Sequence, residues 1–566
     1  MRVLLLDVDN ISYDLVKPEA SVYEDSDLKH MSVDDAMVMM VSVEDDDDNS
    51  TADAALADAR KSMGQLGRKR IVIYPFAHLS NRLSEPKKAI KIVERIYDAA
   101  ASDTGIEAIK APFGWNKKWS ISMKGHPLAE QGKSYGAQGA ARPYKKSKPV
   151  SVNTSIVRKS VESGLPETDH RTIGERLDLF SFQEVSPGMV YWHGNGLVLF
   201  SQVMAFIREM ERKYDYVEVS TPSLANIALW HVSGHIDHYK DNMFVFSSEN
   251  ESLGMKPMNC PSTILIYKSR KWSYRDLPFR TAIFDRLYRN EISGALTGLF
   301  RVRELTQDDG HIFLAEEQLE DELTMLLRLV KEVYDTFGMA FRAKLSTMPD
   351  NHLGDEALWD KATSKLKSAM DSNGIPYETK DKEGAFYGPK IDFDVLDSIG
   401  RSWQCATIQL DYQLPLRFGL EYTGEDGKAH VPVIIHRAVL GTLERFIGVL
   451  IEHYNGRLPL WLSPVQARVI SISEHANAYS EKVYRELKEG GVRAYADLSD
   501  RTLEYKVREA QVQKVPYMII IGKKEQENGT ITIRDRNGKQ EHDVGVAEFL
   551  GRVRKEAQGR SLLSEL

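Results

Sequence analysis

The sequence has few cysteines and no long apolar run. Its 566 residues include only Cys260 and Cys405, too few for a disulfide framework, and this favours a reducing compartment. A membrane-spanning helix would need roughly 18 consecutive apolar residues, which the sequence lacks. Asp7 and Asp9 interrupt the first hydrophobic run, so we expect no export signal. A cytoplasmic protein that does not contact a membrane is the expectation.

An excess of one charge sign is also lacking over most of the chain. The sequence holds 74 Lys and Arg against 82 Asp and Glu, and the first 50 residues carry a net charge of −11, which leaves the remainder at +3. This balance permits a polyanionic partner without indicating one. The five consecutive carboxylates at residues 44–48 most simply predict a solvated loop and give no evidence for a metal site.

Length and periodicity predict several globular domains. At about 150 residues each, the chain accommodates three to four of them, and its 42% hydrophobic and 28% charged content is that of a folded protein. In the first 130 residues, apolar runs predict strands at residues 3–8, 38–43 and 71–76, and helical periodicity covers residues 52–66 and 87–101. Residues 131–167 are rich in Gly, Ala and Lys without periodicity and predict a linker.

The last hundred residues return to alternation after a long mixed segment. Strands are predicted at residues 467–472 and 516–521, and helices at residues 476–488 and 501–512. Asn528-Gly529 and Asn537-Gly538 bracket residues 530–534 and predict two hairpin turns. These signals indicate an α/β unit at the end of the chain.

The familiar glycine-rich nucleotide motifs are absent. Gly132-Lys133-Ser134 resembles the end of a phosphate-binding loop, but Pro127 stands where that pattern needs a glycine. Side chains must therefore hold any ATP. Residues 284–313 read as strand, glycine-containing loop and strand, with Arg289 and Glu291 on one face of the first strand. On one face of the second strand, period two places Arg301, Arg303, Leu305, Gln307, Asp309 and His311.

Such a face could be a plain solvated surface, but two arginines beside an aspartate and a histidine suit a phosphate-bearing ligand better. The segment around Arg289 resembles motif 2 of class II aminoacyl-tRNA synthetases, and TQDDGHIF, ending at Phe313, resembles the threonyl-tRNA synthetase version. Other segments resemble the same family in the same order over residues 168–460: Thr221-Pro222 (motif 1), Gly441-Thr442-Leu443-Glu444-Arg445 (motif 3), Met258-Asn259-Cys260-Pro261, Tyr387-Gly388-Pro389-Lys390, Trp403-Gln404-Cys405-Ala406-Thr407-Ile408-Gln409 and Ile435-His436-Arg437-Ala438.

The resemblance implies an ATP site. Arg289 and Arg445 would hold the ATP phosphates, with Mg²⁺ accompanying the nucleotide, Glu291 would read the adenine edge, and Arg301 would reach the pyrophosphate end. One departure is Leu305, where the family commonly stacks adenine on an aromatic ring.

The resemblance also implies one zinc ion per subunit, bound by Cys260, His311 and His436. Their spacing alone would favour a buried cysteine and two ordinary histidines. Three protein ligands leave zinc an open position, which could take the amino and hydroxyl groups of threonine and reject valine. The remaining threonine pocket would comprise Gln307, Asp309, Tyr387 and Gln409.

Two residues near these motifs can each be interpreted in two ways. His235 matches a family histidine near the terminal adenosine of tRNA, where it would relay a proton, and a structural role is nearly as plausible. Cys405 shares a predicted strand face with Thr407 and Gln409, but a small buried hydrophobe is the preferred reading.

Zinc cannot reject serine, which differs from threonine by one methyl group worth only about 1 to 3 kcal/mol, so a correcting activity is expected. Residues 1–130 resemble the editing domain of archaeal-type threonyl-tRNA synthetases, itself similar to D-aminoacyl-tRNA deacylases. His78, Lys117 and Glu130 align with its functional positions, and Asn116 stands where relatives carry tyrosine. From about residue 463 the chain resembles an anticodon-binding domain, in which Glu525 and Arg534 would contact unpaired bases.

The resemblance therefore implies a multidomain α/β and α+β chain. We expect a D-aminoacyl-tRNA-deacylase-like α/β editing domain (1–130), a linker (131–167), a class II antiparallel-sheet catalytic domain (168–462) and an α/β anticodon-binding domain (463–566). The implied activity joins L-threonine to tRNA(Thr) with ATP in a homodimer and hydrolyses Ser-tRNA(Thr). Two alternatives stay open: a paralogue that charges another small amino acid, and a catalytically silent tRNA-binding protein.

Overall fold

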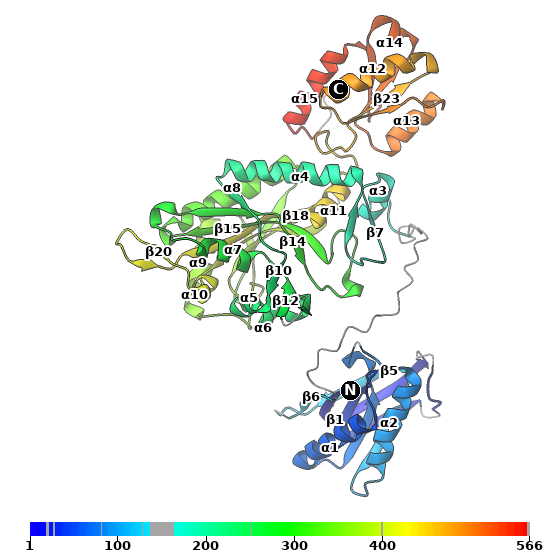
Figure 1. Ribbon diagram of the computed structural model, residues 1–566, viewed down its shortest axis with the longest axis vertical. Helices are drawn as coiled ribbons and strands as arrows, with labels where there is room; N and C mark the ends of the chain where they lie inside the picture. Colours follow the sequence, from blue (N-terminus) through cyan, green and yellow to red (C-terminus); the bar gives the residue numbers. More distant parts are fainter. Residues whose placement is uncertain are drawn as a thin grey trace. The chain divides into compact units, whose positions relative to one another are not determined.

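The computed structural model describes residues 1–18, 22–26, 29–80, 82–126, 128–135, 164–248, 251–397 and 400–562. The chain divides into two compact units, Met1–Ser151 and Val152–Leu566, and each is described by itself (Figure 1). Most of the predicted linker, residues 136–163, lies outside the described residues. Within the described ranges, no helix is both long and apolar enough to cross a membrane.

In the part of the first unit that the structure describes, a six-stranded mixed sheet packs with two α-helices. Its strands run in the order β4-β3-β2-β1-β5, with β6 also paired to β1. The elements are β1 (Arg2–Pro18), β2 (His30–Ser42), α1 (Asn49–Leu66), β3 (Arg70–Pro75), α2 (Pro86–Ala101), β4 (Glu107–Lys110), β5 (Trp115–Met123) and β6 (Glu130–Ser134). The strands and helices predicted in this unit are confirmed. The sheet also takes in residues 131–134, which composition had assigned to the linker.

Side-chain alternation along β1 divides the apolar residues of this unit between two cores. Val3 and Leu5 join the core beneath α1 and α2, whereas Leu6 and Val8 point to the opposite face. Because β2, β3 and β4 are parallel, their carboxyl ends lie at one edge of the sheet. The segment that follows β3 and the start of β5 meet at this edge, which is where parallel sheets commonly bind ligands.

The second unit contains a large, mostly antiparallel sheet. Its strands run in the order β17-β16-β18-β19-β22-β15-β13-β9, with β14 paired to β15. These strands are β9 (Val217–Val219), β13 (Phe279–Ile283), β14 (Arg286–Tyr288), β15 (Glu304–Leu314), β16 (Phe341–Ser346), β17 (Tyr377–Lys380), β18 (Lys390–Leu396), β19 (Ser402–Asp411) and β22 (Val433–Thr442). One continuous core packs the sheet against α4 (Gly194–Lys213), α8 (Leu319–Thr336), α9 (Glu356–Ser372) and α11 (Leu443–His453).

Smaller elements flank the large sheet. They are α3 (His170–Arg176), β7 (Phe180–Phe182), β8 (Val190–Trp192), β10 (Leu224–Asn226), α5 (Ile227–Val232), α6 (His235–Tyr239), β11 (Val245–Ser248), β12 (Glu251–Met255), α7 (Cys260–Lys268), α10 (Gln413–Phe418), β20 (Tyr422–Thr423) and β21 (Ala429–His430). Strand β22 continues directly into α11 through Gly441, whose φ of 70° and closeness to the Cys405 carbonyl exclude any side chain.

The C-terminal part has a five-stranded sheet in the order β24-β23-β25-β26-β27. Its elements are β23 (Ala467–Ser471), α12 (Asn477–Glu489), β24 (Ala494–Asp497), α13 (Leu503–Val512), β25 (Tyr517–Ile521), α14 (Lys523–Asn528), β26 (Ile531–Asp535), β27 (Gln540–Val544) and α15 (Val546–Gln558). The hairpin at Asn537-Gly538 is confirmed. The one at Asn528-Gly529 is wrong, because Gly529 is a left-handed cap that ends α14.

Candidate functional site

A cysteine and two histidines distant in sequence meet on the large sheet. His311 on β15 and His436 on β22 are directly opposite partners in adjacent antiparallel strands, with ring centroids 5.0 Å apart. Cys260 opens α7 and completes the group. All three are buried, and their ligand atoms lie within 4.8 Å of one another. The fold thus creates a compact donor set that no local sequence motif encodes.

The atoms of this cluster fit a metal ion. The Nδ1 atoms of His311 and His436 are buried without a hydrogen-bond partner, which is costly for a polar atom unless a ligand occupies it. His436 donates from Nε2 to Asp411 Oδ2 at 2.8 Å, and such a carboxylate partner typically orients a metal-binding imidazole. One thiolate and two imidazoles are a donor set that zinc favours.

The electrostatics of the two imidazoles differ. Burial lowers the pKa of His311 well below its ordinary value, and the nearby His436 and Arg437 lower it further, so its ring is neutral as metal binding requires. Burial also acts to lower the pKa of His436, but Cys260 and Asp411 raise it to about 10. A cation bound at Nδ1 of His436 would compete with that proton.

The residues predicted to bind threonine surround this cluster. Gln409 on β19 is the register partner of His436, and its amide donates to the Gly388 carbonyl at 3.1 Å. The Tyr387 ring lies 5.2 Å from that of His436. Asp309 accepts a hydrogen bond from Asn259 Nδ2 at 2.7 Å, and Gln307 lies two residues before Asp309 on β15, opposite Thr442 of β22. The structure therefore brings these four side chains to the same region of the sheet as the Cys/His cluster.

The predicted phosphate-binding arginines also converge. Burial lowers the pKa of Arg445, and the neighbouring Arg289 and Arg301 lower it further despite Cys405 and Glu291. Arg445 Nε donates to the Phe300 carbonyl at 3.0 Å, and Arg289 Nε to the Pro257 carbonyl at 3.3 Å. Guanidinium groups crowded in this way are stabilised by an anion such as a triphosphate.

Glu291 and Arg301 pair with each other at 2.7 Å, so the two residues assigned to opposite ends of ATP are joined. Leu305 is buried with Leu287 and Val302 in a small apolar cluster. Its aliphatic side chain presents no ring for stacking.

His235 is fully buried at the start of α6. Its Nδ1 lies 2.8 Å from Ser233 Oγ and its Nε2 3.2 Å from Met258 Sδ. Burial lowers its pKa to about 3, and the nearby His436, His238 and Arg289 add to this. The ring is therefore neutral at physiological pH and a weak base, which suits a structural role better than proton relay.

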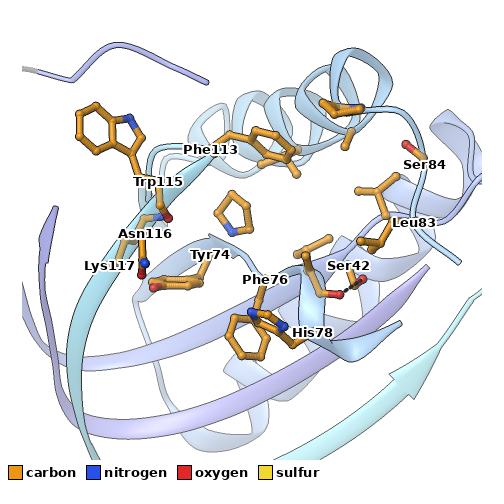
Figure 2. Close-up of a pocket in the computed structure, with 18 of the residues that line it drawn as sticks. Ser42, Tyr74, Phe76, His78, Leu83, Ser84, Phe113, Trp115, Asn116 and Lys117 are labelled. Carbon is orange, nitrogen blue, oxygen red and sulfur yellow. Dashed lines mark hydrogen bonds between the residues drawn. The ribbon is translucent and has the colours of Figure 1, made fainter. Parts of the chain in front are cut away.

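The N-terminal unit contains a pocket of about 410 Å³ at the carboxyl ends of β2 and β3. Figure 2 shows Asn116 and Lys117 on one side, Leu83 and Ser84 opposite, and His78 below. Its walls are mainly aromatic and aliphatic. The predicted editing residues His78 and Lys117 line the pocket, whereas Glu130, at the start of β6, is exposed and does not.

Lys117 is the main cation of this pocket. Its Nζ donates to the Trp115 carbonyl at 3.4 Å and lies 5.0 Å from the centre of the Tyr74 ring. Burial lowers its pKa to about 8, which Glu24 counteracts only partly. The amine therefore changes charge near physiological pH, as functional lysines often do.

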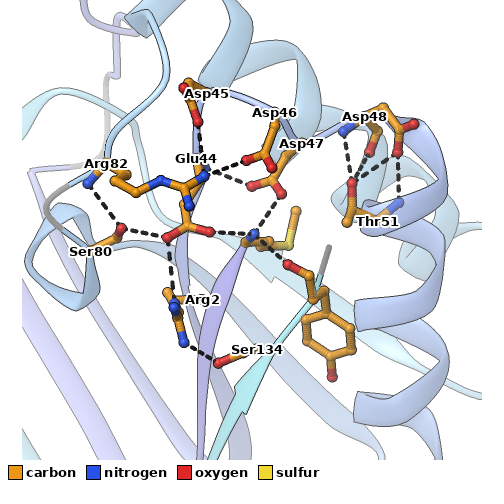
Figure 3. Close-up of polar contacts among 12 residues, drawn as sticks. Arg2, Glu44, Asp45, Asp46, Asp47, Asp48, Thr51, Ser80, Arg82 and Ser134 are labelled. Atoms are coloured by element: carbon orange, nitrogen blue, oxygen red, sulfur yellow. Dashed lines mark hydrogen bonds and ion pairs between the residues drawn. The ribbon is translucent and has the colours of Figure 1, made fainter. Parts of the chain in front are cut away.

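The acidic run beside this pocket is only in part the solvated loop that was predicted, because Asp45, Asp46 and Asp48 are exposed but the other two carboxylates are not. Glu44 and Asp47 are buried and accept from the Met1 amino group at 3.1 and 2.5 Å (Figure 3). Ser80 donates to Glu44 at 2.7 Å, and Arg82 pairs with Asp45 and Asp46. Asp48 caps α1. Because charged groups are rarely buried unless paired, the run anchors the segment that carries His78 and Leu83.

The predicted anticodon contacts lie close together in the C-terminal sheet. Arg534 is on β26, and Glu525 on α14 accepts a hydrogen bond from Thr532 Oγ at 2.8 Å. Thr532 and Arg534 are two residues apart on β26, so their side chains lie on the same face of the strand. The second oxygen of Glu525 accepts from the Gly522 backbone N–H at 2.9 Å, which orients the carboxylate.

Comparison with known proteins identifies the family. Residues 1–135 match the archaea-specific editing domain of threonyl-tRNA synthetase, residues 244–454 the class II core domain of the G, H, P, S and T synthetases, and residues 466–556 an anticodon-binding domain. The crystal structure of the RNA binding domain of threonyl-tRNA synthetase from Cryptosporidium parvum is 43% identical with a TM-score of 0.67, covering 70% of this chain and 99% of that one. The chain belongs to the threonyl-tRNA synthetase family.

Two further relatives match a similar share of the chain. Threonine–tRNA ligase from Thermotoga maritima is 50% identical over 395 residues, covering 70% of this chain and 62% of that protein. A threonyl-tRNA synthetase structure from Aeropyrum pernix has a TM-score of 0.61 at 28% identity, covering 69% of this chain and 95% of that one. The chain thus spans less than two thirds of the curated relatives it matches. These matches confirm the fold class predicted for all three parts.

Sequence reasoning missed two supporting residues of the Cys/His cluster. Asp411 orients His436, and extending the period-two face from Gln409 by two residues would have found it. Asn259, which binds Asp309, lies inside a motif already noted. Asp411 and Asn259 each hold a predicted site residue in place by a hydrogen bond and do not belong to the Cys/His donor set.

The period-two prediction for residues 301–311 holds only in part, because β15 begins at Glu304 and its register with β22 shifts between Gln307 and Asp309. Asp308 accepts the three backbone N–H groups freed there, those of Val439, Leu440 and Gly441, at 2.8 to 3.0 Å. A similar irregularity at Cys405 removes it from the face of Thr407 and Gln409. Its side chain joins the apolar core, as the preferred reading predicted.

Proposed function

We propose that this chain activates L-threonine with ATP, transfers it to tRNA(Thr), and hydrolyses Ser-tRNA(Thr) in the N-terminal pocket. The observation that carries the proposal is the buried Cys260, His311 and His436 group, with unpartnered imidazole nitrogens, beside a cluster of arginines. Membership of the threonyl-tRNA synthetase family supports the choice of amino acid.

Amino-acid selection would use Zn²⁺ held by Cys260, His311 and His436. Bound zinc would take one of the amino and hydroxyl groups of threonine at its open position and the other on expansion to five ligands, and valine lacks the hydroxyl group. Asp309 would offer a carboxylate to the amino group, positioned by its hydrogen bond from Asn259. Tyr387 and Gln409 close the pocket around the side chain.

Activation needs positioning and charge stabilisation more than acid or base catalysis. The threonine carboxylate attacks the α-phosphorus of ATP, forms the adenylate and displaces pyrophosphate. Arg289, Arg301 and Arg445 neutralise the phosphates together with Mg²⁺ carried by the nucleotide. Glu291 is ion-paired with Arg301, and binding of ATP would replace this pair so that Glu291 contacts the adenine. His235 keeps the shape of the adjoining wall.

Hydrolysis of the mischarged product would take place in the N-terminal pocket. Lys117, with a pKa of about 8, offers a cation to the carbonyl oxygen of the seryl ester, where negative charge develops. His78 lines the pocket mouth and provides a polar contact. Glu130 lies away from the pocket in this conformation, so we assign the chemistry to Lys117 and His78 together with the 2′-hydroxyl of the tRNA.

A homodimer is the proposed assembly. Strand β9 ends the large sheet, and Val217 on it is half exposed, so an edge of the sheet next to Thr221 is available to a second copy. Glu525 and Arg534 would contact the anticodon of tRNA(Thr). Molar mass in solution, measured by light scattering, tests the dimer.

Threonine-dependent exchange of pyrophosphate into ATP tests the proposed activation. We expect exchange with threonine, weaker exchange with serine and none with valine, and we expect a strong chelator to abolish it until zinc is restored. Exchange without threonine specificity would favour the paralogue, and no exchange in zinc-loaded protein would favour a silent tRNA-binding protein.

Deletion of residues 1–140 tests the assignment of editing. The truncated chain should retain threonine-dependent exchange and lose hydrolysis of preformed Ser-tRNA(Thr). Equal hydrolysis by the truncated and intact chains would contradict the N-terminal assignment.

A further inference from the structure

His170, at the start of α3, is a fully buried histidine outside the sites described above. The backbone N–H of Leu299 donates to its Nε2 at 3.0 Å. Since an amide nitrogen can only donate, Nε2 must carry the lone pair and Nδ1 the proton. Nδ1 then donates to Glu452 Oε1 at 2.7 Å. Both nitrogens are therefore used, and His170 is neutral in a defined tautomer.

Glu452 is held ionised on the other side of this ring. Burial would raise its pKa, but hydrogen bonds from His170 and Arg401 keep it below the ordinary value. The backbone N–H of His170 adds a further bond to the same oxygen at 2.9 Å. Although Asp169, His170 and Glu452 are close enough to hold a cation, their hydrogen bonds leave no free donor set of the kind seen at Cys260.

The position of His170 fixes the turn that precedes β15. Its ring packs against Phe300 with centroids 4.1 Å apart, and Phe300 packs against Trp403 at the same distance. Gly298 makes this approach possible, because a Cβ there would lie 2.2 Å from His170 Nε2. The turn therefore contacts His170 through one backbone hydrogen bond and one aromatic face.

Two carbonyl groups next to these rings bind Arg445. The Phe300 carbonyl accepts from Arg445 Nε at 3.0 Å, and the carbonyl of Gln404, the residue after Trp403, accepts from Arg445 Nη1 at 3.4 Å. Arg445 and Glu452 both belong to α11, so one helix provides the anchor of His170 and the arginine that these carbonyls hold. A continuous series of contacts therefore links His170 to Arg445 through Phe300 and Trp403.

We propose that His170 is a positioning residue for ATP binding, acting through Phe300 to aim the Arg445 guanidinium at the phosphates. This inference rests on the proposed function, since it assumes that Arg445 binds ATP. Because His170 contacts none of the residues around the Cys/His cluster, its effect should be confined to the nucleotide.

The test measures pyrophosphate exchange by the full chain with zinc bound. His170→Ala should raise KM for ATP about tenfold, the loss expected for one buried hydrogen bond and its packing, while KM for threonine stays within about twofold. His170→Gln retains an acceptor and a donor and should recover most of the loss. His453→Gln, at the last residue of α11, changes a histidine whose ring contacts Tyr454; it is the matched control and should leave both KM values unchanged.

A double-mutant cycle separates positioning from general destabilisation. If His170 acts through Arg445, His170→Ala should add little to the ATP defect of Arg445→Ala. Additive effects, or an unchanged KM for ATP in folded His170→Ala, would overturn the inference. If His170→Ala fails to fold, His170→Leu takes its place, because leucine fills similar space without either hydrogen bond and should raise KM for ATP where His170→Gln does not. Failure of the wild-type chain to exchange pyrophosphate would instead overturn the proposed function.

Discussion

The N-terminal pocket and the Cys/His cluster of the large sheet are built in opposite ways. The pocket is an open space of about 410 Å³ with aromatic and aliphatic walls and one principal cation, Lys117. The cluster is buried; Asp411 holds His436 by a hydrogen bond, whereas the Nδ1 atoms of both imidazoles have no hydrogen-bond partner. Replacing any one metal ligand of the cluster should therefore abolish the activity of that site, whereas replacing a residue of the pocket should reduce hydrolysis only in part.

The two sites also belong to separate compact units. Mutations in one should leave the chemistry of the other intact, because residues that share no contacts usually act independently. Each of the following predictions tests this separation.

Replacing a proposed metal ligand should have the largest effect. Cys260→Ser should lower threonine-dependent pyrophosphate exchange by about 10³-fold or more, since it removes the thiolate donor and leaves only two imidazoles to hold the metal. Metal analysis should show loss of zinc. Hydrolysis of Ser-tRNA(Thr) should be unchanged, and Cys405→Ser, at the other buried cysteine, serves as the control. Retention of stoichiometric zinc by Cys260→Ser would contradict the ligand assignment.

Removing the cation of the N-terminal pocket should come next. Lys117→Met should slow Ser-tRNA(Thr) hydrolysis about a hundredfold, as loss of one electrostatic contact to a developing oxyanion typically does. Pyrophosphate exchange is the internal control and should not change. An unaltered hydrolysis rate would exclude Lys117 from the chemistry.

The pH dependence of hydrolysis gives an independent test of the same lysine. Because the pKa of Lys117 is lowered to about 8, its charged form predominates below pH 8 and is lost above it. Hydrolysis should therefore fall as pH rises through 8. Lys117→Arg keeps its charge throughout this range, so the residual rate of that variant should not show the fall. A wild-type rate that increases through pH 8 would point to the neutral amine as a base.

Loss of the carboxylate behind His436 should have a moderate effect. Asp411→Asn should weaken zinc binding by about 10- to 100-fold without removing a ligand, because the carboxylate orients the ring and fixes its tautomer. Competition with a chelator of known affinity measures this change. Affinity equal to that of the wild type would mean that the cluster orients His436 by packing alone.

The smallest effect is expected at the rim of the pocket. Arg82→Ala removes half-exposed ion pairs with Asp45 and Asp46 and should cost under about 1 kcal/mol of stability. Thermal unfolding measures this cost, and the hydrolysis rate should change little. A large loss of hydrolysis would show that the segment carrying His78 depends on these ion pairs.

From the sequence, the Cys/His donor set and the order of the domains could be predicted better than the local geometry could. Family motifs identified Cys260, His311 and His436, which spacing alone would have left unrelated. Asp308 could not be recognised as the acceptor for three backbone N–H groups, because the register shift in β22 that frees them depends on pairing between distant strands. His170 was missed for the same reason, since its partners Leu299 and Glu452 are more than a hundred residues away.

Charge patterns misled where tertiary contacts decided burial. The run at residues 44–48 reads as solvated, yet Glu44 and Asp47 are buried because Met1, Ser80 and Arg82 supply partners for the run. Asn528-Gly529 reads as a hairpin, yet the residues before it form a helix that needs a left-handed glycine at its end. The first signal misled because the partners of the run are distant in the sequence, and the second because a hairpin turn and a helix end use the same left-handed glycine.

The most direct test of the account measures both activities in one pair of variants, Cys260→Ser and Lys117→Met. We predict that Cys260→Ser loses threonine-dependent pyrophosphate exchange and keeps Ser-tRNA(Thr) hydrolysis, and that Lys117→Met shows the reverse. Loss of both activities in either folded variant, or exchange by Cys260→Ser at the wild-type rate, would contradict the account of two separate sites.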